Sequence, residues 1–224
     1  MEVNDPGHSS APGDTHVASN GGNTRGEIFV VDDEPAIRTI LSTVLSRHGY
    51  DAVCFADGAS LLAAARARTP ACIILDVHIP GESGLDVLKH LNAQDYPAPI
   101  LIMSGQGDIP MAVDAIKHGA LDFIEKPFRG NEVIARVTQA IQASKRLSSP
   151  EHSSPNLSVR LSGYEPLTRR EREVLSQVMT GASSKEAGRQ LGISSRTVEV
   201  HRARIMEKLG AKNAADLIRI ALTG

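Results

Sequence analysis

Five short apolar runs constrain the fold of this chain more than any other feature. Each run has almost no polar alternation, and they are Ile28–Val31, Ala52–Phe55, Cys72–Leu75, Ile100–Met103 and Leu121–Ile124. A run of this kind predicts a strand that is buried on both faces, as in a parallel sheet. The chain is therefore expected to begin its folded part with a buried sheet.

The segments between these runs have the spacing of helices. The first carries an apolar stripe that ends before Gly49, a natural glycine just beyond a helix, and the stripe is Ile37, Ile40, Leu41, Val44 and Leu45. Two later segments have similar stripes: Leu85, Leu88 and Leu91, and Ile134, Val137 and Ile141. Alternating strands and helices predict an α/β doubly wound, five-stranded parallel sheet with helices on both faces.

Composition divides the chain into two domains. Residues 1–26 have few apolar side chains, which predicts a disordered tail, and a Ser- and Pro-rich stretch predicts a linker at 146–164. The first domain is then 27–145 and the second is 165–224. Residues 26–130 carry 8 basic and 14 acidic groups, whereas residues 166–224 carry 11 basic and 6 acidic groups. The basic excess favours a polyanionic partner for the second domain.

The second domain contains helical patterns only. Thr168 and Glu171 have the spacing of a capping box. Farther on, a helix over Ser184–Leu191, a turn at Gly192 and a second helix capped by Ser194 form a helix-turn-helix pattern. We expect a small all-α helix-turn-helix domain, although an ordinary helical bundle with a basic surface would have the same charge.

Polar residues follow four of the five predicted strands. Asp32 and Asp33 follow the first run, Asp76 the third, Ser104 the fourth and Lys126 the fifth. If the strand order is 2-1-3-4-5, the three carboxylates meet where the order reverses. Such a cluster favours a hard cation such as Mg²⁺, and with a lysine it suits phosphoryl transfer. A single Asp at a strand end is commonly a helix cap, so only the whole set carries this interpretation.

Residues 27–145 resemble the receiver domain of two-component response regulators. The resemblance is carried by VVDDEP (Val30–Pro35), LDVHIPGESG (Leu75–Gly84), MSGQGD (Met103–Asp108) and DFIEKPF (Asp122–Phe128). It implies that Asp76 is the phosphoacceptor. It also implies a Mg²⁺ site made by Asp33 and Asp76 directly, by Asp32 through water, and by the backbone carbonyl of His78.

The same resemblance assigns the switch. Lys126 would pair with the phosphoryl group, Ser104 would donate its hydroxyl to it, and Phe123 would turn inward as Ser104 moves. Lys126–Pro127 would be a cis peptide. Phosphorylation would drive formation of a homodimer through the face of the fourth helix and fifth strand, where Val113 and Lys117 point outward.

Residues 167–222 resemble the LuxR-type DNA-binding domain of the FixJ/NarL class. The string SSRTVEVHRARIMEKLGAKN (Ser194–Asn213) is especially close to the FixJ branch. The resemblance implies that the second helix of the motif enters the major groove of double-stranded DNA. The expected DNA-binding residues are Lys185, Arg196, Thr197, Glu199, Val200, Arg202, Ala203, Arg204 and Lys208.

Within that set, the side chains suggest a division of labour. Arg202 and Arg204 are long cations that suit backbone phosphates. Glu199 would accept a hydrogen bond from cytosine N4, or would instead pair with Arg196 or Arg202 along the helix. If Glu199 does not read bases, the thymine-methyl contacts of Val200 and Ala203 would do so.

The expected function is a phosphorylation-activated, DNA-binding transcriptional regulator. A sensor histidine kinase would phosphorylate it, and RNA polymerase is a further candidate partner. It would be no enzyme beyond catalysing its own phosphorylation and dephosphorylation. A Mg²⁺-dependent phosphohydrolase is the first alternative, but His78 stands where such enzymes carry a second Asp. A phosphate sink with a vestigial helical domain is the other alternative.

Sequence features also bear on location. The chain has no apolar run near the roughly 20 residues of a membrane span and no secretory signal pattern. Its two cysteines, Cys54 and Cys72, lie in apolar runs and are expected to be buried and reduced. We expect a cytoplasmic protein.

Overall fold

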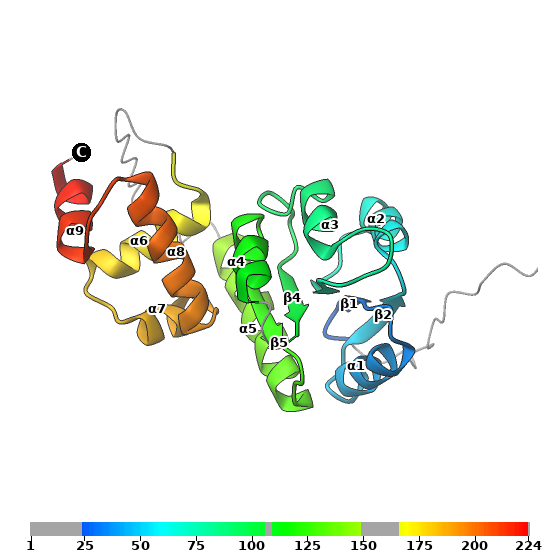
Figure 1. Ribbon diagram of the computed structural model, residues 1–224. Helices are drawn as coiled ribbons and strands as arrows, with labels where there is room; N and C mark the ends of the chain where they lie inside the picture. Colours follow the sequence, from blue (N-terminus) through cyan, green and yellow to red (C-terminus); the bar gives the residue numbers. More distant parts are fainter. Residues whose placement is uncertain (1–23, 106–108, 149–165, 224) are drawn as a thin grey trace, which may run out of the picture.

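The computed structural model describes residues 24–105, 109–148 and 166–223. Strands and helices alternate in the first part, and helices alone follow in the second (Figure 1). The strands are β1 (Glu27–Val31), β2 (Asp51–Phe55), β3 (Cys72–Asp76), β4 (Ile100–Ser104) and β5 (Asp122–Glu125). The helices of the first part are α1 (Pro35–Arg47), α2 (Gly58–Ala67), α3 (Gly84–His90), α4 (Ile109–Lys117) and α5 (Gly130–Ser148). Those of the second part are α6 (Arg169–Met179), α7 (Ser184–Leu191), α8 (Ser195–Lys208) and α9 (Ala214–Thr223).

The five strands form one parallel sheet in the order β2-β1-β3-β4-β5. The predicted fold class and the conditional strand order are both confirmed. Because β1 and β3 are neighbours and their connections run in opposite directions across the sheet, the order reverses between them. Their carboxyl ends therefore lie side by side at the switch point.

Each face of the sheet is covered by its own set of helices. Alternate side chains of a strand point to opposite faces, so Phe29 and Ile73 join a core with α2, α3 and α4. Ile28 and Ile74 join a second core with α1 and α5. All five residues of β3 and of β4 are buried, which explains their continuous apolar sequences.

The helical part has a third core, formed by side chains of all four helices. Its capping signals work as predicted: Thr168 and Glu171 form a capping box before α6, and Ser194 accepts a hydrogen bond from the Thr197 backbone before α8. The turn between α7 and α8 needs Gly192, which adopts the left-handed conformation with φ of 69°. A tight turn of this kind sets the two helices at the angle of a helix-turn-helix.

Three details differ from the expectations. Ile40 is 51% exposed, because the apolar stripe of α1 is wider than its contact with the sheet. Cys54 is only half-buried, whereas Cys72 is fully buried. Helix α5 continues to Ser148, past the boundary expected at 145.

The predicted tail up to residue 23 and the predicted linker from 149 lie outside the described residues. None of the described helices is long and apolar enough to cross a membrane.

Candidate functional site

The predicted carboxylates meet at the carboxyl edge of the sheet. Asp32 and Asp33 follow β1 and Asp76 ends β3, and one oxygen from each lies within 4.8 Å of the others. Asp32 and Asp76 are buried, at 0% and 4% exposure, whereas Asp33 is exposed. Three carboxylates at this spacing, one of them open to solvent, fit a hard divalent cation that keeps some of its waters.

Lys126 completes this acidic cluster from the end of β5. Its ammonium donates hydrogen bonds to Asp32 (2.8 Å) and to Asp76 (2.7 Å). Burial raises the pKa of Asp76 above its usual value, although the hydrogen bond from Lys126 opposes the rise. Burial alone would lower the pKa of Lys126, but the hydrogen bonds to the two carboxylates raise it overall. The lysine therefore stays charged beside Asp76.

Hydrogen bonds hold the segment that carries Asp32 and Asp33 in place. At the other side of the cluster, the Lys126–Pro127 peptide is cis, as expected. The Glu34 amide donates to Asp32, and the Arg38 guanidinium donates to the backbone carbonyls of Asp32 (2.7 Å) and Asp33 (2.9 Å). Arg38 was not anticipated from the sequence, because a lone arginine on the first helix has no motif to single it out.

A glycine allows the loop after β3 to close on the site. A Cβ at Gly84 would contact the Asp76 backbone oxygen and would lie 2.9 Å from the Val77 Cα. The Gly84 amide instead donates to the Val77 carbonyl at 2.9 Å. The start of α3 can therefore pack directly on the backbone that carries Asp76.

The two predicted switch residues lie on neighbouring strands. Ser104 ends β4 and is 3% exposed, and its backbone carbonyl accepts a hydrogen bond from the Lys126 amide at 2.7 Å. Phe123 on β5 is half-buried and packs against the core on the α4 side. The structure thus brings Ser104 close to the acidic cluster and places Phe123 toward the helical domain.

Helix α8 carries most of the predicted DNA-binding residues, and its two faces differ. Its inner face is buried in the helical core through Val198, Ile205 and His201. Burial lowers the pKa of His201 to about 4, and the nearby Arg170 charge adds to this effect, so the ring is neutral at neutral pH. On the outside, Glu199 and Ala203 are exposed, as is Lys185 on α7.

Several predicted DNA-binding cations already have partners within the protein. Lys208 is nearly buried and pairs with Glu171 at 3.0 Å. Arg204 pairs with the same carboxylate at 3.2 Å. Burial would raise the pKa of Glu171, but its hydrogen bonds with Thr168 and Lys208 lower it overall. The capping-box pattern identified Glu171 in the sequence. It did not predict that Glu171 is also the buried partner of two cations.

The outer face of α8 lies against the receiver-like part. Helix α8 lies next to α4 (Figure 1). Val200 packs on the core of the sheet, and the Arg196 guanidinium lies 5.5 Å from the centre of the Phe123 ring. Arg204 donates to the backbone carbonyl of Lys117, at the end of α4 (2.9 Å). In this arrangement the receiver-like part covers a portion of the α8 face that is expected to contact DNA.

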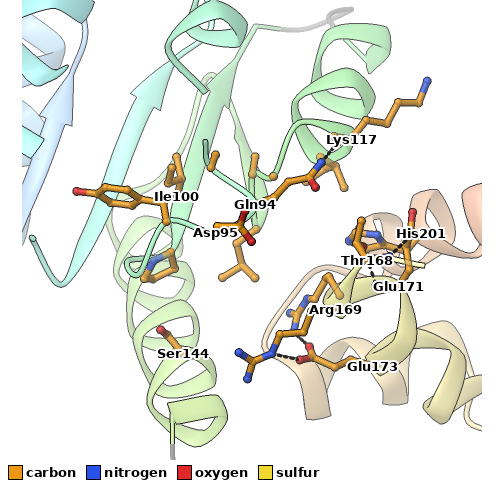
Figure 2. Close-up of a pocket in the computed structure, with 18 of the residues that line it drawn as sticks. Gln94, Asp95, Ile100, Lys117, Ser144, Thr168, Arg169, Glu171, Glu173 and His201 are labelled. Carbon is orange, nitrogen blue, oxygen red and sulfur yellow. Dashed lines mark hydrogen bonds and ion pairs between the residues drawn. The ribbon is translucent and has the colours of Figure 1, made fainter. Parts of the chain in front are cut away.

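A cavity of about 410 Å³ remains between the two parts. Figure 2 shows Asp95 of the loop before β4 and Ile100 at the start of β4 on one side, and Thr168, which precedes α6, and His201 of α8 on the other. Among the described residues, the buried side-chain atoms without a hydrogen bond all belong to residues that line this cavity: Arg170 Nε, His201 Nε2 and Glu171 Oε1, which has only its ion pair with Arg204. The contact between the two parts is therefore incompletely packed.

Two domain families match the chain in this order. Residues 28–138 match the response regulator receiver domain, and residues 165–221 match the luxR family of bacterial regulatory proteins. The transcriptional regulatory protein FixJ of Bradyrhizobium diazoefficiens is 38% identical over 199 residues, which cover 89% of this chain and 96% of FixJ. The response regulator protein TodT of Pseudomonas putida is 39% identical over 86% of this chain and 84% of its own.

A solved structure supports the same relationship. Full-length FixJ from B. japonicum matches with a TM-score of 0.56 at 38% identity, covering 89% of this chain and 97% of that one. This chain belongs to the response regulators that join a receiver domain to a LuxR-type DNA-binding domain. It is a phosphorylation-dependent transcription regulator of the two-component type. The receiver implies a sensor kinase as a partner, and the second domain implies binding to DNA.

Proposed function

We propose that Asp76 is the residue that a sensor histidine kinase phosphorylates. The observation that carries this proposal is the position of its carboxylate, 2.7 Å from the Lys126 ammonium and within reach of Asp32 and Asp33. An Asp76 oxygen attacks the phosphorus, the P–N bond of the kinase phosphohistidine breaks, and its electron pair returns to the imidazole nitrogen. The product is an acyl phosphate on Asp76.

The residues around Asp76 would bind Mg²⁺ and the phosphoryl group. Asp33 and Asp76 would bind the ion directly, together with the backbone carbonyl of His78, and Asp32 would act through water. The ion would supply charge neutralisation for the phosphoryl oxygens. Lys126 would then turn from Asp76 to a phosphoryl oxygen, and Ser104 would donate its hydroxyl to another. These groups give the receiver catalysis of its own phosphorylation and dephosphorylation only.

Phosphorylation would act on the contact between the domains. As Ser104 moves toward the phosphoryl group, Phe123 turns inward and leaves its position beneath Arg196. Shifting a two-state equilibrium from 1:99 to 99:1 takes about 5.5 kcal/mol, which two or three charge-assisted hydrogen bonds at the phosphoryl group can provide. The open state would then present α8 to DNA.

We further propose that the homodimer forms through the face of α4 and β5. Val113 and Lys117 lie on α4, the helix that α8 contacts in this structure. The same face cannot hold α8 and a second receiver together, so opening and dimerisation favour one another. Val113→Asp should leave phosphorylation intact and keep the protein monomeric in sedimentation experiments, and a normal phosphorylated dimer would rule out this face.

On DNA, α8 would divide its work as the sequence suggests. Arg202 lies 3.4 Å from the Ser184 hydroxyl, and together with Arg204 it would bind phosphates. Glu199, Val200 and Ala203 would face the bases, with Lys185, Arg196, Thr197 and Lys208 at the edges of the footprint. In the described part of the chain, Glu199 forms no ion pair with Arg196 or Arg202, which favours base reading. The bound dimer would act in the cytoplasm, with RNA polymerase as its next partner.

The phosphoacceptor assignment is tested by labelling with acetyl phosphate and Mg²⁺. The wild type should gain an acid-stable, alkali-labile phosphoryl group. Asp76→Asn keeps the side-chain shape without the nucleophile and should not be labelled, and Asp33→Ala should lose both Mg²⁺ binding and labelling. Asp51→Asn, at the opposite edge of the sheet, is the matched control and should be labelled normally. Labelling of Asp76→Asn at the wild-type level would contradict the assignment.

A further inference from the structure

The first turn of α8 rests on a single receiver carboxylate. Asp122, at the start of β5, is 1% exposed. It accepts hydrogen bonds from the Ser194 amide (2.9 Å), the Ser194 hydroxyl (2.9 Å) and the Thr197 hydroxyl (2.5 Å). Within its own domain it pairs with Arg136 at 2.6 Å. Three of its four hydrogen bonds therefore cross to the DNA-binding domain.

These partners lie at the amino end of α8. Ser194 is the residue that caps this helix, and its hydroxyl also accepts a hydrogen bond from the Thr197 amide at 3.0 Å. The amino end of a helix carries partial positive charge and unpaired N–H groups, so it attracts anions such as phosphate. In helix-turn-helix proteins this end of the second helix is the part that meets DNA. A carboxylate bound at this end of α8 therefore occupies the position that a DNA phosphate would take.

We propose that Asp122 is an intramolecular stand-in for a DNA phosphate and that it latches the unphosphorylated receiver onto α8. The proposal takes α8 to be the DNA-reading helix, as in the proposed function. While Asp122 binds Ser194 and Thr197, those groups and the positive helix end are closed to DNA. When the domains separate, the same donors become available to a phosphate oxygen of similar charge and geometry.

The neighbouring residue links this latch to the switch. Asp122 directly precedes Phe123, whose ring lies beneath Arg196. Two consecutive residues of β5 therefore hold Arg196 and Thr197, both expected at the DNA interface. Because Phe123 directly follows Asp122, a turn of the Phe123 ring removes the cation–π contact immediately beside the latch. Phosphorylation can then weaken the Asp122 hydrogen bonds and the Arg196 contact together, because the two β5 residues involved are neighbours.

The packing around Asp122 bears on how much the latch contributes to the contact between the domains. The cavity of about 410 Å³ between α6, α8 and the loop before β4 leaves that side loosely packed (Figure 2). Apolar contacts between the described parts include Leu121, which packs against the helical core, and Val200, which packs on the sheet. Beside this cavity, a group of charge-assisted hydrogen bonds contributes to holding the domains together.

The test uses the unphosphorylated full-length protein, measured by small-angle scattering and by affinity for a DNA duplex of arbitrary sequence at fixed salt. Non-specific affinity depends on phosphate contacts, which are the contacts that Asp122 would block. Asp122→Asn should increase the radius of gyration and raise the DNA affinity about tenfold. Arg136→Met is the control, because it removes the ion pair inside the receiver but keeps the hydrogen bonds across the contact. It should stay closed and bind DNA like the wild type.

A second pair of variants approaches the latch from the other domain. Ser194→Ala removes one cross-domain donor and one helix cap, whereas Ser183→Ala removes the equivalent cap of α7, which lies away from Asp122. Ser194→Ala alone should increase the radius of gyration. Wild-type scattering of both Asp122→Asn and Ser194→Ala, or equal opening by Arg136→Met, would overturn the proposal. Neither readout depends on phosphorylation, so this result is independent of the Asp76 assignment.

Discussion

The acidic cluster and the α8 contact hold charged groups in two different ways. In the cluster, Asp32, Asp76 and Lys126 come from strands of one sheet, so their neighbourhood is part of the receiver fold. At the contact, Asp122 and Thr197 come from different domains and meet only when the domains dock. The first arrangement is fixed once the receiver folds, whereas the second can be broken without unfolding either domain. The acidic cluster can therefore accept the phosphoryl group as a rigid site, while the contact between Asp122 and α8 responds by breaking.

The largest expected effect concerns the fixed site. Lys126→Met leaves Asp32 and Asp76 buried without their cation, and breaking a buried pair in this way costs about 3–5 kcal/mol of unfolding free energy. Urea unfolding in the presence of a chelator measures the loss, and added Mg²⁺ should restore part of it. Lys89→Met removes only the exposed pair with Asp86 and should cost less than about 1 kcal/mol. Equal losses from the two variants would show that the cluster is no more tightly coupled than a surface pair.

The inner face of α8 should show a pH dependence that its outer face lacks. The pKa of His201 is about 4 in the folded protein, below the ordinary 6.5, so the unfolded chain takes up the proton first as the pH falls. The His201 contribution is at its full value above about pH 6.5. By pH 4 the DNA-binding domain should have lost up to about 3 kcal/mol through this group.

Calorimetry of wild type and His201→Gln between pH 4 and 7 separates this loss from that of the carboxylates. The variant should have a flatter profile in this range. A His201→Gln profile parallel to the wild type would contradict the assignment of the loss to this ring.

Base reading should depend on the part of α8 that the receiver leaves open. Glu199 is exposed in the closed arrangement, and its carboxylate is an acceptor of the kind that reads cytosine N4. In a binding-site selection, Glu199→Ala should relax the preference at one base pair per half-site, an effect of about 1–3 kcal/mol. An unchanged base preference would contradict this role of Glu199 and would indicate that Val200 and Ala203 read the bases.

The smallest effect tests the fit of the helix-turn-helix turn against α5. A Cβ at Gly192 would lie 2.9 Å from the Ala143 Cβ and 2.9 Å from the Gln139 carbonyl oxygen. Gly192→Asn should push the domains apart and raise the DNA affinity of the unphosphorylated protein about fivefold, an effect of about 1 kcal/mol. Gly181→Asn carries a similar backbone cost, because its φ is also positive, but a side chain there meets nothing within 4 Å. Opening by both variants would mean that strain in the turn, and not the contact, is responsible.

The same contrast explains how far the sequence could predict the structure. Once the strands are parallel and ordered 2-1-3-4-5, the ends of β1 and β3 lie side by side, so Asp32 and Asp76 must meet. The place of Lys126 beside them followed from the resemblance to receiver domains. The caps before α6 and α8 were equally predictable, since each needs only residues close in sequence. Local patterns and a known topology were sufficient for these features.

Features that depend on docking could not be predicted in this way. Asp122 lies inside an apolar run and reads as an ordinary strand residue until Ser194 and Thr197 are placed beside it. Ile40 has the spacing of a buried residue, but only Leu41 and Leu45 of α1 are fully buried and Ile40 is 51% exposed. In both cases the deciding partner lies on another element, and no spacing within the chain indicates the distance to it.

The central claim is that phosphorylation of Asp76 frees α8 for DNA. Its most direct test compares DNA affinity of the full-length wild type and of Asp76→Asn, each with and without acetyl phosphate and Mg²⁺, at one salt concentration. The wild type should bind at least about tenfold more tightly after treatment, while Asp76→Asn should keep one affinity throughout. A wild-type protein that is fully labelled on Asp76 but binds DNA no more tightly than before would contradict the account.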